Sequence, residues 1–448
     1  MSPHAEGAFP EAEASDGSGL GICSAMNEDF AYMGVRQGWN EEVPFGLTVA
    51  DRRHHTYVVG KTGTGKTTLL RNLIVQDIAA GRGVGVIDPH GDLARELLDY
   101  IPASRTEDVV YFDPADHDFP IGLNLLQPTS ADGRHLITSG VVSAFKNIWR
   151  DSWGPRMEWV LSACISALLE CENVSILGIP RMLIDEHYRL WVLKQVKDPV
   201  VRSVWERELG RYDKRLWQEA IAPIQNKIGQ FLIAPPVRNV LGQVRGRIDA
   251  GFMMDNKRIF IANLSKGRLG EDKSNLLGAI LVTMFQLAAM GRSVAPEERR
   301  EDFSLFVDEF QNFTSDSFAS ILSEARKYRL ALTLSHQHVS QLRDEIRESV
   351  FGNVGSIIAF RVGSEDAELL SREFDGAFPA SHYTQLRKFE VCAKLLTDGE
   401  YGNLISGTTL PPLGTHFGRR DTIIHRSREK YASRRATVEE KIRRWLGR

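Results

Sequence analysis

Cysteine, net charge and long apolar stretches are all scarce in this sequence. Four cysteines occur in 448 residues, and no C-x-x-C pair or histidine cluster accompanies them, which argues against a zinc or disulfide scaffold. The formal net charge is −3, so the composition as a whole does not indicate a nucleic-acid partner. The most apolar stretches, 159–169 and 276–290, are shorter than the ~20 residues of a transmembrane helix. We therefore expect two buried helices and reduced core thiols at Cys23, Cys164, Cys171 and Cys392.

Charge is distributed unevenly between the two ends of the chain. Residues 1–50 carry eight acidic side chains and one basic side chain, Arg36. The segment 1–35 has few large apolar side chains and no signal-peptide pattern, so we expect a flexible N-terminal segment there. The tail, 416–448, is strongly basic. Its last part, 438–446, is predicted to be a helix, because Thr437 and Glu440 have the spacing of a capping box. Such a tail is compatible with binding DNA, an anionic membrane surface or an acidic protein, and equally with a solvated amphipathic helix.

Short apolar runs alternate with helical patterns on both sides of a long helical region. The runs before this region are 55–59, 84–88 and 109–112, and those after it are 258–262, 303–307, 330–334, 356–360 and 389–396. Continuous apolar strands that alternate with helices are typical of a parallel sheet covered on both faces. The predicted fold is therefore α/β with a mostly parallel sheet. Its first part is 36–133 and its second part 251–415, and an all-α domain, 134–250, is inserted between them.

The strongest motif is Gly60-Lys61-Thr62-Gly63-Thr64-Gly65-Lys66-Thr67, a full match to G-x-x-x-x-G-K-[ST]. It lies between the run 55–59 and a helical pattern over 67–80, as a phosphate-binding loop requires. The glycines let backbone N–H groups approach phosphate oxygens, and the helix N-terminus adds its dipole. Lys66 is expected to neutralise the β- and γ-phosphates and Thr67 to hold Mg²⁺, with Thr68 near the α-phosphate. The motif predicts a site for ATP and Mg²⁺.

Two carboxylates follow the apolar run 303–307. Asp308 is expected to hold Mg²⁺ through water, and Glu309 is expected to polarise the water that attacks the γ-phosphate. Taken alone, the pair is equally compatible with solvated acids at a strand end. Together with the phosphate loop, it predicts a nucleoside triphosphate hydrolase of the P-loop class.

Four further polar residues are candidates for roles around this site. Gln337 follows the run 330–334 and could sense the γ-phosphate, although polar residues also occur at ordinary strand ends. Arg361 and Arg326 are candidates for an arginine that completes the site of a neighbouring subunit, and the alternative for both is a surface ion pair. Asp88 either orders the site or belongs to a Pro-Gly turn and helix cap.

These residues together resemble the type IV coupling proteins of bacterial conjugation, within the FtsK–HerA superfamily of DNA-pumping ATPases. The matching segments besides the phosphate loop are 86–92, 152–156, 261–270, 306–330, 334–338 and 352–374. The resemblance covers about residues 40–415. It implies a RecA-like core with an inserted all-α domain, a homohexameric ring and ATP-driven movement of DNA. It assigns Lys66, Thr67, Asp308 and Glu309 to the roles given above and supports Gln337 as the sensor.

The resemblance also implies partners. DNA would be bound without sequence preference, and relaxosome or type IV secretion components would be protein partners. Lys266 and Arg268 are candidates for a pore loop that contacts the phosphate backbone, with a plain basic turn as the alternative. Coupling proteins typically begin with transmembrane helices, and this sequence shows none, so we expect a cytoplasmic protein that reaches the inner membrane only through partners.

Two other functions stay open at this point. One is a motor of the same kind that works in repair, chromosome segregation or defence against phage. The other is an ATP-dependent assembly scaffold that recruits DNA-processing or secretion proteins. A scaffold needs no water-activating base, so the carboxylate of Glu309 favours an ATPase.

Overall fold

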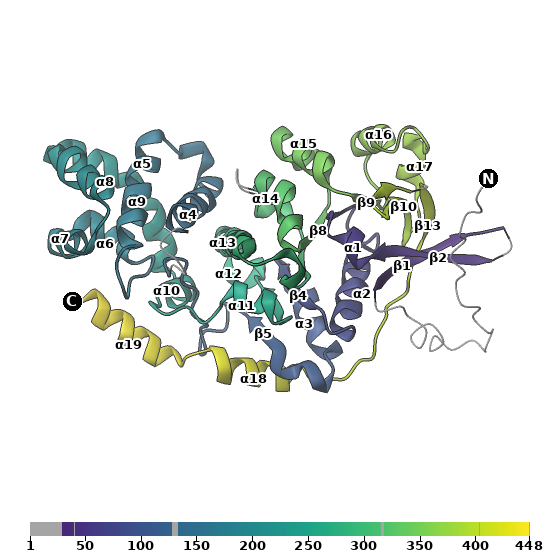
Figure 1. The fold of residues 1–448 in the computed structure, drawn as a ribbon, viewed down its shortest axis with the longest axis horizontal. Coiled ribbons are helices and arrows are strands. Elements are labelled where there is room, and N and C mark those ends of the chain that lie inside the picture. The colour runs from purple at the N-terminus through teal and green to yellow at the C-terminus, as the bar shows by residue number, and fades with distance from the viewer. Residues whose placement is uncertain (1–28, 40, 128–132, 315–317, 403, 448) are drawn as a thin grey trace.

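The computed structural model describes residues 29–39, 41–127, 133–314, 318–402 and 404–447, so Cys23 and most of the segment 1–35 lie outside the described residues. The centre of the fold is an 11-stranded sheet (Figure 1). From one edge to the other its strands are β2 (Glu42–Thr48), β1 (Phe30–Gln37), β13 (Ile405–Thr409), β10 (Glu390–Lys394), β9 (Ser356–Ala359), β3 (Thr56–Val59), β8 (Leu330–His336), β7 (Phe303–Val307), β4 (Gly83–Asp88), β6 (Ile259–Asn263) and β5 (Val109–Phe112). The short strands β11 (Leu396–Thr397) and β12 (Glu400–Tyr401) form a separate pair.

The larger part of the sheet is parallel. Every pairing from β9 through β3, β8, β7, β4 and β6 to β5 is parallel, whereas β10, β13, β1 and β2 pair antiparallel. The parallel strands are buried along their whole length, because helices cover both faces. The predicted α/β class with a mostly parallel sheet is confirmed.

Alternate residues of most parallel strands enter two separate cores. In β6, Ile259 and Ile261 face the core beneath α2 (Lys66–Ala79) and α3 (Asp92–Leu97), whereas Phe260 and Ala262 face the core on the other side. That second core contains α13 (Glu271–Gly291), α14 (Phe318–Glu324) and α15 (Asp344–Asn353). The sheet is thus the middle layer of three. Because its central strands are parallel, their carboxyl ends all lie on the same side of this layer.

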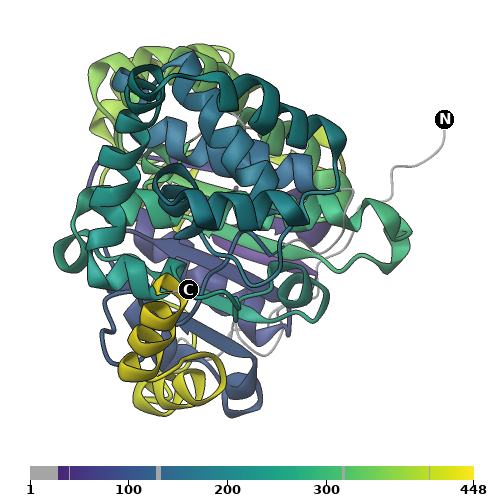
Figure 2. The ribbon, with the colours of Figure 1, turned by 90° about the vertical axis from the view of Figure 1, so that its left-hand side faces the viewer.

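Between β5 and β6 the described part of the chain has helices and no named strand. These helices are α4 (Arg134–Ile148), α5 (Pro155–Leu168), α6 (Gly178–Ile184), α7 (Glu186–Gln195), α8 (Pro199–Ser203), α9 (Lys214–Ile233), α10 (Pro235–Leu241) and α11 (Ala250–Asp255). Those from α4 to α10 gather at one end of the molecule, which Figure 2 shows from the front. We call α4–α10 the helical region. Its helix α4 packs against α13, which lies on the sheet. The domain boundaries at 133 and 250 stay a prediction.

The helix α13 is longer than its apolar stretch suggested. Within the described residues it is the one helix that is long and apolar enough to cross a membrane, so the length argument made for 276–290 does not hold. However, 72% of its most apolar window is buried inside the protein. Ile280, Leu281 and Phe285 are fully buried against neighbouring helices and the sheet, as in the core helix of a folded domain. The three described cysteines are also buried and free, as predicted.

The predicted flexible segment 1–35 is wrong in its last residues, because β1 begins at Phe30. This strand pairs with β2 and, on its other side, with β13 from the far end of the chain. Gly34 allows this close pairing, since a Cβ there would lie 2.4 Å from the carbonyl oxygen of Thr408. The strand depends on a distant partner and was therefore not visible in the local pattern.

The basic tail forms two helices, α18 (Arg420–Tyr431) and α19 (Arg435–Leu446), which run from the β5 edge to the helical region (Figure 1). The predicted capping box is wrong, because α19 begins at Arg435 and Glu440 instead pairs with arginines one turn later. The helix is amphipathic, as the alternative expected, and its basic side chains, such as Arg443 and Arg444, are exposed, but its apolar side packs on the rest of the chain. Val438 and Ile442 are buried, and the Trp445 indole donates to the Asn173 carbonyl at 3.0 Å.

Candidate nucleotide site

The phosphate-binding loop, residues 60–65, joins β3 to α2 at the carboxyl edge of the sheet. Gly63 and Gly65 have φ values of 77° and 123°, which favour glycine. Aromatic rings back the loop on its inner side, since a Cβ on Gly65 would lie 2.7 Å from the Phe389 ring. Lys61, Thr62 and Gly63 are exposed on the outer side. One side of the loop is therefore packed against aromatic side chains, and the other side is accessible to a ligand.

Lys66 points into this loop from the first turn of α2. Its ammonium group donates to the carbonyl oxygens of Gly60 and, at 3.2 Å, of Lys61. Burial lowers the pKa of Lys66, and the charges of Asp308 and Glu309 oppose this shift. The acidic neighbours keep the ammonium group charged, and polyphosphate oxygens are stronger acceptors for it than the two neutral carbonyl oxygens.

Strand order brings the three motifs together. The strands β3, β8 and β7 are adjacent and parallel, so their carboxyl ends lie side by side. The phosphate loop follows β3, Gln337 follows β8 and the two carboxylates follow β7. The Gln337 amide accepts a hydrogen bond from Thr62 Oγ1 at 3.0 Å and donates to Glu309 Oε1. The predicted sensor therefore links the phosphate loop directly to the predicted base.

Asp308 is a buried carboxylate near other acidic groups. Burial raises its pKa, and the charges of Asp88 and Glu309 raise it further, whereas Lys66 lowers it. The first turn of α2 carries the hydroxyls of Thr67, which is exposed, and Thr68, which is half-buried. A divalent cation would relieve the repulsion between these carboxylates. The donor set fits Mg²⁺, which usually takes one or two carboxylates together with substrate phosphates.

No group of three or more His, Cys, Asp or Glu side chains in the described ranges could hold a metal without a substrate. Thr67 and Asp308 stay the predicted ligands of Mg²⁺ in the presence of a bound nucleotide. The nucleotide-binding residues likewise stay a prediction from the motif, namely Gly60, Lys61, Thr62, Gly63, Thr64, Gly65, Lys66, Thr67 and Thr68.

Glu309 adopts an unusual backbone conformation and is held by several side chains. Its φ of 49° and ψ of 46° are left-handed, which costs about 1–3 kcal/mol in a residue other than glycine. Gln311 Nε2 donates to Glu309 Oε2 at 2.6 Å, and Asn312 Nδ2 donates to the Glu309 carbonyl at 2.8 Å. Burial alone would raise the pKa of Glu309. Interactions with His90, Gln311 and Gln337 outweigh burial and lower the pKa to about 2.

Sequence reasoning missed His90, Gln311 and Asn312. The His90 ring nitrogen lies 3.9 Å from Glu309 Oε1, and this neighbour is the main reason for the raised pKa of His90. Asp88 accepts from the backbone N–H of His90 at 2.8 Å and of Ala94 at 2.9 Å, so it has the turn and helix-cap role. The Pro-His-Gly turn at the end of a predicted strand was the one available indication of His90.

The two candidate arginines lie at opposite ends of the parallel strands. The carbonyl of Arg361 accepts from the Lys61 N–H at 2.8 Å, and its exposed side chain forms no ion pair within the described ranges. Arg326 precedes β8, at the amino edge, where its guanidinium lies 2.9 Å from His54 Nδ1. Arg361 therefore lies beside the phosphate loop of its own subunit, whereas Arg326 does not.

The pore-loop candidates belong to α12 (Lys266–Leu269), and both bind neighbours in the same chain. Lys266 donates to Asn312 Oδ1 at 3.0 Å and pairs with Glu271, and Arg268 pairs with Asp113 at 2.6 Å. A role in DNA contact stays a prediction for both.

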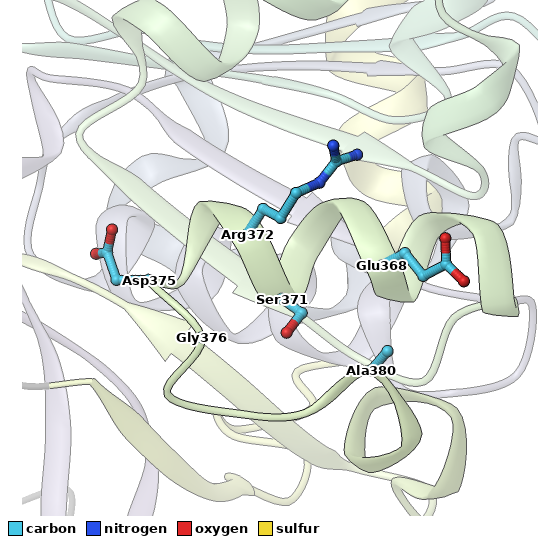
Figure 3. A pocket seen from close by; sticks show the side chains of 6 residues that line it. All are labelled: Glu368, Ser371, Arg372, Asp375, Gly376 and Ala380. Atoms are coloured by element: carbon cyan, nitrogen blue, oxygen red, sulfur yellow. The ribbon is translucent and has the colours of Figure 1, made fainter.

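A cavity of about 640 Å³ lies elsewhere, between α16 (Ser364–Glu373) and α17 (Ala380–Gln385). Figure 3 shows that the charged groups of Glu368, Arg372 and Asp375 point in different directions and do not converge. This cavity contains none of the predicted site residues. This cavity is therefore not part of the candidate nucleotide site.

Two protein-family models match parts of the chain. The model described as "Helicase HerA, central domain" matches residues 37–139, which include the phosphate loop. The model described as "TraM recognition site of TraD and TraG" matches residues 302–374, which include Asp308, Glu309 and Gln337. No curated protein matches the sequence.

Several solved structures are similar along most of the chain. The bacterial conjugative coupling protein TrwBdeltaN70, in its unbound monoclinic form, has a TM-score of 0.60 at 14% identity over 83% of this chain and 88% of that one. Plasmid coupling protein TrwB in complex with ADP and Mg²⁺ has a TM-score of 0.59 at 13% identity, over 86% and 96%. VirB4 of Thermoanaerobacter pseudethanolicus has a TM-score of 0.56 at 13% identity, over 85% and 96%.

These matches confirm two predictions. The chain resembles the type IV coupling proteins, and its fold is the RecA-like P-loop fold of these neighbours. At such low identity the structural likeness concerns the fold, so activity must be argued from the site itself.

Proposed function

We propose that this protein is a ring-forming ATPase that uses ATP hydrolysis to move DNA, as a motor of the type IV coupling-protein type. The observation that carries the proposal is the chain of contacts from Thr62 in the phosphate loop through Gln337 to Glu309. It connects a group that can contact the γ-phosphate with a carboxylate that can accept a proton from water. A protein that only binds nucleotide needs no such connection.

The residues present can perform hydrolysis in one displacement step. Lys66 and the backbone N–H groups of the loop hold the β- and γ-phosphates, and Glu309 accepts a proton from the attacking water. The water oxygen forms a bond to the γ-phosphorus while the bond to the β–γ bridging oxygen breaks, which yields ADP and phosphate. Mg²⁺, held by Thr67 and Asp308, would neutralise phosphate charge.

A neighbouring subunit would complete this site. Ring-shaped P-loop motors use an arginine from the next subunit to stabilise transition-state charge. Arg326 fits this role, because its place at the amino edge prevents it from reaching the site of its own chain. Arg361 lies beside its own loop and fits a role within the subunit. We propose a homohexamer, as the resemblance implies.

DNA as cargo is supported by the conjugative coupling proteins among the structural neighbours, and relaxosome or secretion components as partners are supported by the match to the TraM recognition site. We place the protein in the cytoplasm, with attachment to the inner membrane through partners. The match to the HerA central domain favours one alternative, a DNA motor in repair, segregation or phage defence.

The test is the steady-state ATPase rate with and without single- and double-stranded DNA, at low and moderate salt. A DNA motor is expected to be stimulated by DNA, and the stimulation is expected to fade with salt because phosphate contacts are electrostatic. A rate that is indifferent to both kinds of DNA would contradict DNA as the cargo. Loss of the rate in Lys66→Ala would still identify the nucleotide site in that case.

A further inference from the structure

The carboxylate of Glu309 is held at both of its oxygens. Gln337 donates to Oε1 and also contacts the phosphate loop, so its role follows from the predicted sensor. Gln311 donates to Oε2 at 2.6 Å and has no contact with the loop among the described residues. The proposed function assigns a role to Gln337 but none to Gln311.

The backbone around Gln311 is fixed. It lies in the 3-10 turn Phe310–Asn312, directly after Glu309. Phe310 is fully buried and packs on the rings of Tyr57 and Phe318, and Asn312 holds the Glu309 carbonyl. Because both neighbours of Gln311 are anchored, its side chain is the part of the turn that can change partner.

Gln311 also lines a crevice between two parts of the molecule. The crevice has a volume of about 300 Å³, with Asn147 at the end of α4 and Arg150 just after it on one side, and Gln311, Thr314 and Gln341 on the other. Gln311 Oε1 is buried and has no hydrogen-bond partner in the described structure. A buried amide oxygen without a partner is unfavourable, so a different side-chain conformation gains a contact wherever the crevice offers a donor.

The hydrogen bond from Gln311 affects the chemistry of Glu309. The donor occupies Oε2 and fixes the direction in which this oxygen faces, so an attacking water cannot use it while the hydrogen bond is in place. If the Gln311 amide can move away from Glu309, the site has two conformations, one in which Glu309 is restrained and one in which it is active.

We propose that Gln311 is a positioning residue that restrains Glu309, and that the restraint ends when the Gln311 amide turns into this crevice. The inference rests on the proposed ATPase function and concerns its regulation. In the restrained conformation Gln311 binds Glu309 Oε2. In the active conformation its amide turns into the crevice and that oxygen becomes available to the attacking water.

Gln311→Met tests the restraint, because it keeps the length of the side chain and removes the donor. We expect kcat of the full-length protein without DNA to rise about tenfold, since a hydrogen bond to a charged group contributes at least that factor. KM for ATP should not change, because the nucleotide contacts are untouched. Gln341→Met is the matched control, as it removes a glutamine from the same crevice and should leave kcat unchanged. Gln311→Asn, one methylene shorter, should also raise kcat.

Thermal unfolding of each variant separates restraint from folding. If both Gln311 variants unfold at the wild-type temperature and turn over no faster than wild type, the restraint is refuted. A merely structural role would lower the unfolding temperature without raising kcat, and this outcome also refutes the proposal. The double variant Lys66→Ala with Gln311→Met must be inactive. Activity in that double variant would instead refute the proposed nucleotide site.

Discussion

Replacing Glu309 by glutamine separates water activation from nucleotide binding. Glu309→Gln removes one negative charge, keeps the size of the side chain and leaves Lys66, Thr67 and residues 60–65 unchanged. We expect ATP to bind with nearly normal affinity and turnover to fall by about 10²–10⁴, the usual contribution of a general base. This loss corresponds to about 3–5 kcal/mol in the activation barrier.

The neighbours of Glu309 explain why binding should survive. The wild-type pKa of about 2 means that Glu309 is ionised throughout the neutral range, so its charge is part of the site at working pH. That charge contributes to the raised pKa of Asp308. Removing it favours the ionised form of Asp308, and an ionised Asp308 holds Mg²⁺ better. The substitution should therefore affect the chemical step and leave metal and nucleotide binding intact.

Phosphate release measures turnover of this variant, and a fluorescent ATP analogue measures its affinity. The matched control is Glu368→Gln, which removes the same charge from an exposed position on α16 away from the loop. Turnover of Glu309→Gln within about twofold of wild type would refute Glu309 as the base, because a general base contributes far more. Loss of nucleotide binding would show instead that the carboxylate is needed to hold the site.

Lys66→Ala should abolish ATP turnover, because the cation inside the loop is lost; normal turnover would overturn the site assignment. Mixing Arg326→Ala with Lys66→Ala should restore some turnover, because each mixed ring then contains complete sites. A mixture with Arg361→Ala should stay inactive, and the reverse pattern would exchange the two roles. Ending the chain at residue 417 removes Ile423, Val438 and Ile442, which are buried and contribute about 1.5–3 kcal/mol each. Urea titration should show a clear loss of stability, and an unchanged midpoint would contradict the packing of the tail.

The parallel half of the sheet could be predicted because each strand carries its own pattern. Both faces of β5 and β7 are buried, so each is a continuous apolar run whose bounds are those predicted. In the antiparallel half, β10 lies within the predicted run 389–396, whereas β1, β2 and β13 carry no such pattern. A Cβ on Gly407 would lie 2.6 Å from the Val35 carbonyl oxygen, so β13 and β1 need glycine where strand propensity disfavours it. Their pairing also joins opposite ends of the chain, which local periodicity cannot indicate.

The same distinction applies within the site. Gln337 could be predicted because the carboxyl ends of neighbouring parallel strands share one edge, so strand order alone places it near Glu309. Gln311 could not be predicted, since its contact depends on the left-handed backbone of Glu309 and on a side-chain conformation. Strand order therefore fixes where the base lies, and side-chain conformations fix how it is restrained. The restraint is for that reason the part of the site that one substitution can change without changing the fold.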